Sequence, residues 1–88
     1  MDILHQPEKR RFVVTLEQGE AELEYTLRDR TLTITHTYVP PTARAQGVAG
    51  KMTAAALEYA HEQALNVVPI CSFAVSYMAR EARRQERA

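Results

Sequence analysis

The sequence predicts an α+β fold that consists of a three-stranded antiparallel meander, a fourth strand parallel to the third, and a C-terminal helix. Three observations support this class. Residues 11–39 show the two-residue alternation of strands, residues 48–65 change to a helical period, and a short apolar run follows at residues 67–71. Two strands of one sheet that flank a helix require a crossover, which is right-handed in nearly all proteins and makes the two strands parallel.

The chain of 88 residues has material for one core, so we expect a single domain over residues 1–88, with residues 1–9 and 81–88 poorly ordered. Its 11 basic residues balance its 11 acidic residues, which excludes the positive surplus on which nucleic-acid binding depends. It has neither a signal-peptide segment nor a run of roughly 20 apolar residues. We therefore expect a cytoplasmic protein with no nucleic-acid or membrane partner.

Residues 11–28 predict the first two strands. Both halves of this segment alternate between apolar and polar side chains, and Gln18-Gly19 between them supplies a tight reversal, because glycine tolerates positive φ. This alternation places the glutamates of the second strand on the solvent-exposed face. The side chains expected on the inner face are Phe12, Val14, Leu16, Ala21, Leu23, Tyr25 and Leu27.

Residues 31–39 predict the third strand, after a polar turn at residues 28–30. The segment is rich in β-branched residues. Its alternation places Leu32, Ile34, His36 and Tyr38 on one face and four threonines on the other. Pro40-Pro41 cannot donate ladder hydrogen bonds, so the strand must stop or leave its neighbour there.

A helix, a strand and a second helix are expected to complete the fold. The first helix follows from apolar residues at helical spacing, with Lys51, Glu58 and Glu62 on its wet side. Asn66 ends this helix, residues 67–71 form a short buried strand, and Ser72 is the expected N-cap of the last helix. The apolar positions of the first helix are Val48, Met52, Ala55, Ala56, Tyr59 and Ala60.

The segment from Arg44 to Lys51 lies between a strand end and a helix start, where unpaired backbone N–H groups and a positive dipole end accumulate. Gly47 and Gly50 let the backbone approach an anion closely, and the small side chain of Ala49 does not block the anion. Arg44 and Lys51 add positive charge. A phosphate site and a glycine turn that only starts a helix both remain open from the spacing.

The pattern Arg44-x-x-Gly47-x-Ala49, between a strand that ends in Tyr38-Val39-Pro40 and an amphipathic helix, resembles the Arg/Gln-x-x-Gly-x-Gly/Ala signature of the GNAT superfamily of acetyltransferases. The segments at residues 36–40, 47–51, 55–57 and 69–73 resemble its short, single-domain branch, and the resemblance covers about Phe12 to Met78.

This resemblance implies a truncated GNAT-like fold with acetyl-CoA (coenzyme A) as cofactor. The pantetheine would run between the splayed third and fourth strands, the pyrophosphate would bind the loop from Ala45 to Gly50, and a backbone N–H near Val39 would polarise the thioester carbonyl. The implied cofactor-binding residues are Val39, Arg44, Ala45, Gln46, Gly47, Val48, Ala49, Gly50 and Lys51.

Cys71 is the leading catalytic candidate. It is the only cysteine, which excludes an intramolecular disulfide, and it ends the fourth strand just before a helix start, where the helix dipole favours a thiolate. It could accept the acetyl group, or protonate the departing CoA thiolate while an amine attacks directly. A lone cysteine between apolar residues is also a common core filler.

His36 and Tyr77 are the other catalytic candidates. His36 is either a core histidine with one satisfied nitrogen, which we favour, or a base near the thioester. Tyr77 is either the tyrosine acid that larger GNAT enzymes carry or a core aromatic on an amphipathic helix. Tyr38 stands where the resemblance implies a carboxylate base in other members, so no carboxylate is supplied at this position.

The functional hypothesis is therefore an N-acetyltransferase that transfers acetyl from acetyl-CoA to an amine. The alternatives are a CoA-binding module without efficient catalysis and a small interaction domain whose glycine loop binds nothing. The helices that shape the acceptor pocket of larger members are missing, which favours an amine on a protein or peptide, or a pocket completed by a partner, over an enclosed small metabolite. The histidines have no ligand spacing with Cys71 or paired carboxylates, so no metal site is expected. The oligomeric state is not predicted.

Overall fold

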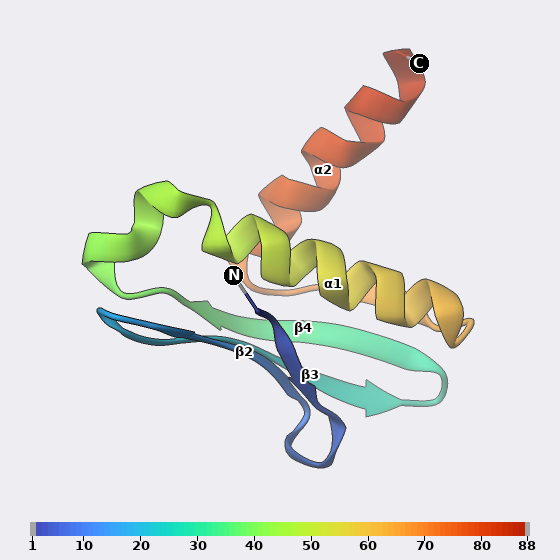
Figure 1. Cartoon of the computed structure of the whole chain (residues 1–88). Coiled ribbons are helices and arrows are strands. Elements are labelled where there is room, and N and C mark those ends of the chain that lie inside the picture. Colours follow the sequence, from blue (N-terminus) through green and yellow to red (C-terminus); the bar gives the residue numbers. More distant parts are fainter. Residues whose placement is uncertain (1, 88) are drawn as a thin grey trace.

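A computed structural model describes residues 2–87 as a five-stranded mixed sheet with helices packed on one face (Figure 1). The strands lie in chain order, with neighbours antiparallel from β1 to β4 and β5 parallel to β4. The α+β class and the β-α-β crossover are thus confirmed. The elements are β1 (Leu4–Gln6), a 3-10 helix η1 (Pro7–Lys9), β2 (Arg11–Leu16), β3 (Gly19–Arg28), β4 (Thr31–Tyr38), a 3-10 helix η2 (Pro41–Gln46), α1 (Val48–Glu62), β5 (Asn66–Pro69) and α2 (Ser72–Arg87).

The core lies between α1 and the inner face of the sheet. The predicted faces of β2, β3 and α1 are confirmed, because their apolar positions are buried or packed against buried residues and Lys51, Glu58 and Glu62 are exposed. The largest fully buried side chains are Leu23, Leu32, Ile34, Met52, Val14, Val48 and Thr53. No helix within residues 2–87 is long and apolar enough to cross a membrane.

The first strand, β1, was not predicted; it lies within residues 1–9, where we expected poor order and of which residue 1 lies outside the described residues. It pairs with β2 in the register Leu4↔Val13 to Gln6↔Arg11. His5 anchors it, because its ring stacks on Phe12 with the centroids 4.1 Å apart and its Nε2 is 2.6 Å from the Tyr25 hydroxyl oxygen. A three-residue strand is too short to display the alternation from which strands are recognised.

A register shift divides β4 into two halves that present opposite faces. Tyr25 pairs with Ile34, but the preceding residue of β3, Glu24, pairs with His36, so Thr35 is an extra residue in β4. A β-bulge of this kind reverses the alternation beyond it. The prediction that His36 and Tyr38 share a face with Leu32 and Ile34 is therefore wrong.

The last strand, β5, pairs with only the first half of β4, from Thr31↔Asn66 to Ile34↔Pro69. Beyond these pairs the N–H groups of Ile70 and Cys71 both donate to the Ile34 carbonyl oxygen, at 2.9 and 3.2 Å, and the chain turns into α2. The third and fourth predicted strands thus separate at this point. The fourth strand is not buried as predicted, because it lies at the sheet edge with Val68 43% and Ile70 63% exposed.

The last helix, α2, packs on the rest of the molecule near its start and then projects away from it (Figure 1). Ala74, in its first turn, is fully buried. The helix continues through residues 81–87, where we expected poor order, and residue 88 lies outside the described residues.

Candidate functional site

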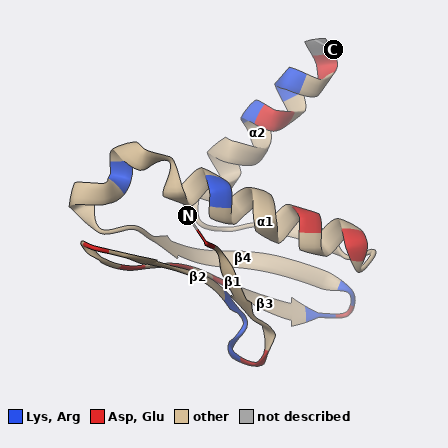
Figure 2. Cartoon of the chain, in the orientation of Figure 1, with Lys and Arg blue, Asp and Glu red and all other residues tan. Residues whose placement is uncertain are grey.

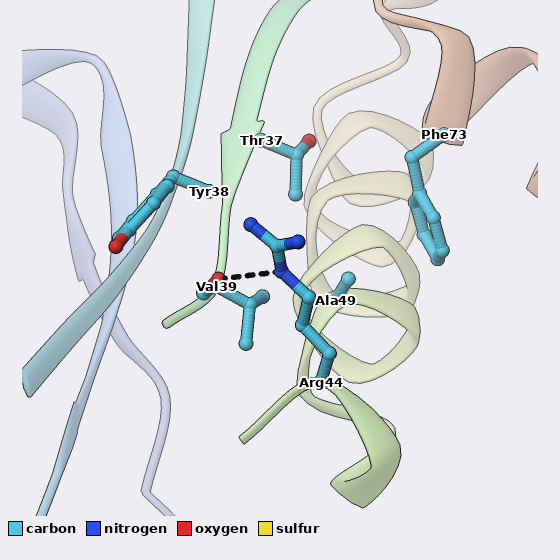
Figure 3. A pocket seen from close by; sticks show the side chains of 6 residues that line it. All are labelled: Thr37, Tyr38, Val39, Arg44, Ala49 and Phe73. Atoms are coloured by element: carbon cyan, nitrogen blue, oxygen red, sulfur yellow. Dashed lines mark hydrogen bonds between the residues drawn. The ribbon is translucent and has the colours of Figure 1, made fainter. Parts of the chain in front are cut away.

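A pocket of about 260 Å³ opens where β4 and β5 separate (Figure 3). Its walls come from the end of β4, from η2, from the first turn of α1 and from the start of α2. The side chains that line it are Thr37, Tyr38, Val39, Arg44, Ala49 and Phe73. Three of these, Val39, Arg44 and Ala49, belong to the predicted cofactor-binding set.

The predicted glycine loop has more regular structure than we expected. Arg44, Ala45 and Gln46 lie in η2, and Gly47 alone links η2 to α1 with a φ of 74°. Gly47 is the N-cap of α1 and offers no side-chain hydrogen bond to the first turn. The first intrahelical bond runs from the Lys51 N–H to the Gly47 carbonyl oxygen at 3.2 Å. The N–H groups of the first turn therefore lack an intrahelical acceptor.

Positive charge flanks this helix start. Figure 2 shows basic residues in η2 and in the first turn of α1, which are Arg44 and Lys51, both exposed. The Arg44 Nε donates a hydrogen bond to the Val39 carbonyl oxygen at 3.1 Å, so the guanidinium lies against the end of β4 beside the pocket (Figure 3). An anion at the start of α1 would meet these charges and the positive end of the helix dipole.

Cys71 lies beside the pocket and caps α2. Its carbonyl oxygen accepts the N–H of Val75 at 3.1 Å, and its Sγ accepts the N–H of Ala74 at 3.4 Å. These are the two bonds that an N-cap residue makes, so the cap falls one residue before the predicted Ser72. The half-buried thiol also lies 3.4 Å from the Thr37 hydroxyl oxygen.

Tyr77 lies on the α1 side of α2. A Cβ added to Gly50 would lie 3.6 Å from a ring carbon of Tyr77, so the ring packs over the first turn of α1. The ring of Tyr77 also stacks with Phe73, with the centroids 6.1 Å apart. Tyr77 thus joins the two helices that border the pocket.

His36 lies on the opposite face of the sheet from the core. It is exposed, and its ring nitrogens and the carboxylates of Glu22 and Glu24 offer atoms within 4.8 Å of one another. The core-histidine interpretation is wrong, because the bulge at Thr35 turns this side chain outward. Arg11 donates to the Glu22 carboxylate at 3.1 Å, so one member of the group is already paired with a cation and we assign no metal site.

Thr37 and Phe73 are pocket residues that the sequence analysis missed. The bulge alone turns Thr37 to the helix side of β4, and alternation gives no sign of it. Phe73 was noted only as the residue after the expected N-cap and as part of a segment that resembles the family, without a role in the site. Of the catalytic candidates, Cys71 and Tyr77 lie on the helix side of the sheet near the pocket, and His36 does not.

Two comparisons with known proteins agree with this geometry. The family model described as GCN5-related N-acetyl-transferase matches residues 11–86. The solution structure of a GCN5-like candidate N-acetyltransferase from Staphylococcus aureus is 30% identical in sequence, with a TM-score of 0.75 over 96% of this chain and 83% of that one. The parallel β4 and β5, the crossover through α1 and the family match lead to one conclusion. This chain belongs to the GCN5-related N-acetyltransferase family.

Proposed function

We propose that the protein binds acetyl-CoA in the pocket at the end of β4 and transfers the acetyl group to an amine. The observation that carries this proposal is the position of the pocket, between the separated ends of β4 and β5 and the start of α1, whose N-cap supplies no side-chain hydrogen bond. The pyrophosphate would bind the N–H groups of residues 45–50, with Arg44 and Lys51 beside it. Such a helix start provides both donors and a positive dipole.

The pantetheine and acetyl group would occupy the apolar part of the pocket. Val39, Ala49 and Phe73 offer apolar walls there, and Thr37 lies on the side of Cys71. The backbone N–H of Val39 would polarise the thioester carbonyl and stabilise the oxyanion. One preorganised donor of this kind contributes roughly 2.7 to 4 kcal/mol to such a step.

Cys71 would take part in the transfer by one of two routes. In the covalent route, its sulfur attacks the thioester carbonyl carbon, the bond to the CoA sulfur breaks, and the CoA thiolate departs with the electron pair. An amine then attacks the acetyl-cysteine and restores the thiol. In the direct route, the amine attacks acetyl-CoA and the Cys71 thiol gives its proton to the departing thiolate.

A CoA-binding module without efficient catalysis is the second candidate, and a specific observation favours it. Among the described residues, none of the side chains that line the pocket is a carboxylate or an imidazole. His36, Glu22 and Glu24 lie together on the other face of the sheet. The amine would then have to lose its proton without a base in the pocket.

The first experiment measures intact mass and thermal stability with acetyl-CoA, for the wild type and Cys71→Ala. We expect both proteins to be stabilised, because a ligand at 100 times its dissociation constant adds about 2.7 kcal/mol to the free energy of unfolding. An adduct of about 42 Da on the wild type alone would support the covalent route. Stabilisation without an adduct would leave the direct route or simple binding, and no stabilisation of either protein would refute the proposal.

The phosphate contacts can be tested separately with Arg44→Ala. This variant should bind acetyl-CoA about tenfold more weakly, since a hydrogen bond to a charged group contributes about 1.5 kcal/mol or more. Binding of acetyl-pantetheine, which lacks the pyrophosphate, should be unchanged. Arg28→Ala is the matched control, because Arg28 is an exposed arginine at the end of β3, where it pairs with Thr31 at the end of β4 that is distant from the pocket. Equal losses for both ligands would contradict the placement of the pyrophosphate at Arg44.

A further inference from the structure

Thr37 lies between the pocket and the only thiol of the protein. Its side chain is half-buried and lines the pocket, and its Oγ1 is 3.4 Å from the Cys71 Sγ. The two residues are 34 positions apart, so this contact exists only because β4 and the start of α2 meet in the fold. The Sγ has a second hydrogen-bond partner, the Ala74 N–H, also at 3.4 Å.

The bulge in β4 selects which side chain meets the thiol. With Thr35 as the extra residue, Thr37 faces Cys71 and the exposed imidazole of His36 faces the opposite side. Regular alternation after Ile34 would have turned His36 to the helix side instead. The fold therefore places a hydroxyl, which can donate a hydrogen bond without titrating near neutral pH, next to the sulfur.

We propose that Thr37 is a positioning residue that orients the Cys71 sulfur and stabilises its thiolate by donating a hydrogen bond to it. This inference rests on the proposed function, because the thiolate is the form that attacks the thioester in the covalent route and that remains after proton transfer in the direct route. With the Ala74 N–H, the sulfur then has two donors, and hydrogen bonds to a charged acceptor are stronger than those to a neutral one. Thr37 keeps its proton throughout and acts only through Cys71.

The test is the rate at which iodoacetamide alkylates Cys71, measured against pH in the absence of acetyl-CoA. Cys71 is the only cysteine, so every alkylation event reports on it. Removing the hydroxyl in Thr37→Val should slow alkylation near neutral pH by a factor of about two to ten, and the rates should converge at high pH, where the thiol is ionised in every variant. Thr37→Ser should restore the wild-type profile.

The matched control is Thr33→Val, since Thr33 is a half-buried threonine of the same strand that pairs with Thr26 and Val68. Its alkylation profile should equal that of the wild type. Thr37→Ala provides a second variant without the hydroxyl, and circular dichroism establishes that each variant is folded. An unchanged or faster alkylation rate in a folded Thr37→Val or Thr37→Ala protein would overturn the proposal. Because the assay contains no CoA, a failure of CoA binding is a separate result.

Discussion

Single residues at the edges of the fold have roles that their sequence neighbours do not indicate. His5 belongs to a cluster of rings with Phe12, Tyr25 and Tyr59, which come from three other elements. Burial lowers the pKa of His5 below its usual 6.5, and the nearby Glu8 carboxylate opposes this shift only in part. Burial likewise raises the pKa of the Tyr25 hydroxyl, and the nearby Tyr59 hydroxyl adds to that shift. Both groups are therefore held neutral at physiological pH.

We expect the stability that His5 contributes to fall with acidification. The folded protein binds the His5 proton less readily than the unfolded chain, so the contribution is complete above about pH 6.5 and is lost as the pH falls toward the lower folded-state pKa. Urea unfolding should show wild type more stable than His5→Gln at about pH 8, and this difference should shrink at about pH 5.5. The exposed His61→Gln serves as control, and a difference that grows toward acid would contradict the assignment.

Among the elements, the start of α1 is the one on which the proposed cofactor site depends. Its geometry rests on Gly47, whose φ of 74° lies in the left-handed region. A Cβ there would meet nothing within 4 Å, so any penalty for a larger residue comes from the backbone. Gly50, three residues on, has an ordinary helical conformation, and a Cβ there would contact the Tyr77 ring at 3.6 Å. The two glycines of this motif therefore meet different structural requirements: a left-handed backbone at Gly47 and a position beside the Tyr77 ring at Gly50.

This difference predicts opposite effects of the same substitution. Gly47→Ala should destabilise the protein by about 1 kcal/mol, because the Cβ of a non-glycine residue causes steric strain in the left-handed conformation. Gly50→Ala should be neutral or stabilise by up to about 1 kcal/mol, the gain of alanine over glycine within a helix. Chemical denaturation measures both. Equal effects of the two substitutions would mean that the conformation at Gly47 is not the constraint.

At the scale of the whole molecule, the sheet has one covered and one open face. Helix α1 lies over the inner face, and no helix covers the other face in the part of the chain that the structure describes (Figure 1). The outer face carries an acidic row, Glu20, Glu22 and Glu24, which Arg11 partly neutralises. A domain with a single core layer has little stability in reserve.

A substitution that removes a buried side chain from that layer should therefore destabilise the protein strongly. Leu23 is fully buried in the middle of β3, and Leu23→Ala should cost about 3 kcal/mol through lost burial and the cavity left behind. That is a large fraction of the roughly 5 kcal/mol expected for a small domain. Leu4→Ala should change the midpoint of urea unfolding little, since Leu4 is 58% exposed. Similar losses in both variants would show that the core is not concentrated between α1 and the sheet.

The sequence by itself determined the elements whose pattern is local. Alternation in residues 11–28 and the helical period from Val48 specified which side chains are buried, and the change of period along the chain indicated the β-α-β crossover. These inferences succeed because the period of a strand or a helix can be recognised from the residues of one continuous segment. Cys71 was placed correctly at a helix start for the same reason.

Only the tertiary structure decided the features that depend on partners distant in the chain. The bulge at Thr35 arises from the pairing of β4 with β3, and it exchanges His36 for Thr37 beside Cys71. The edge position of β5 exposes Val68, and the ring of Phe12 gives the short β1 its anchor. A register shift of one residue reverses every later side chain of a strand without changing its composition. Strand pairing therefore determines which residues surround the thiol, and the register of that pairing cannot be predicted from the local sequence pattern.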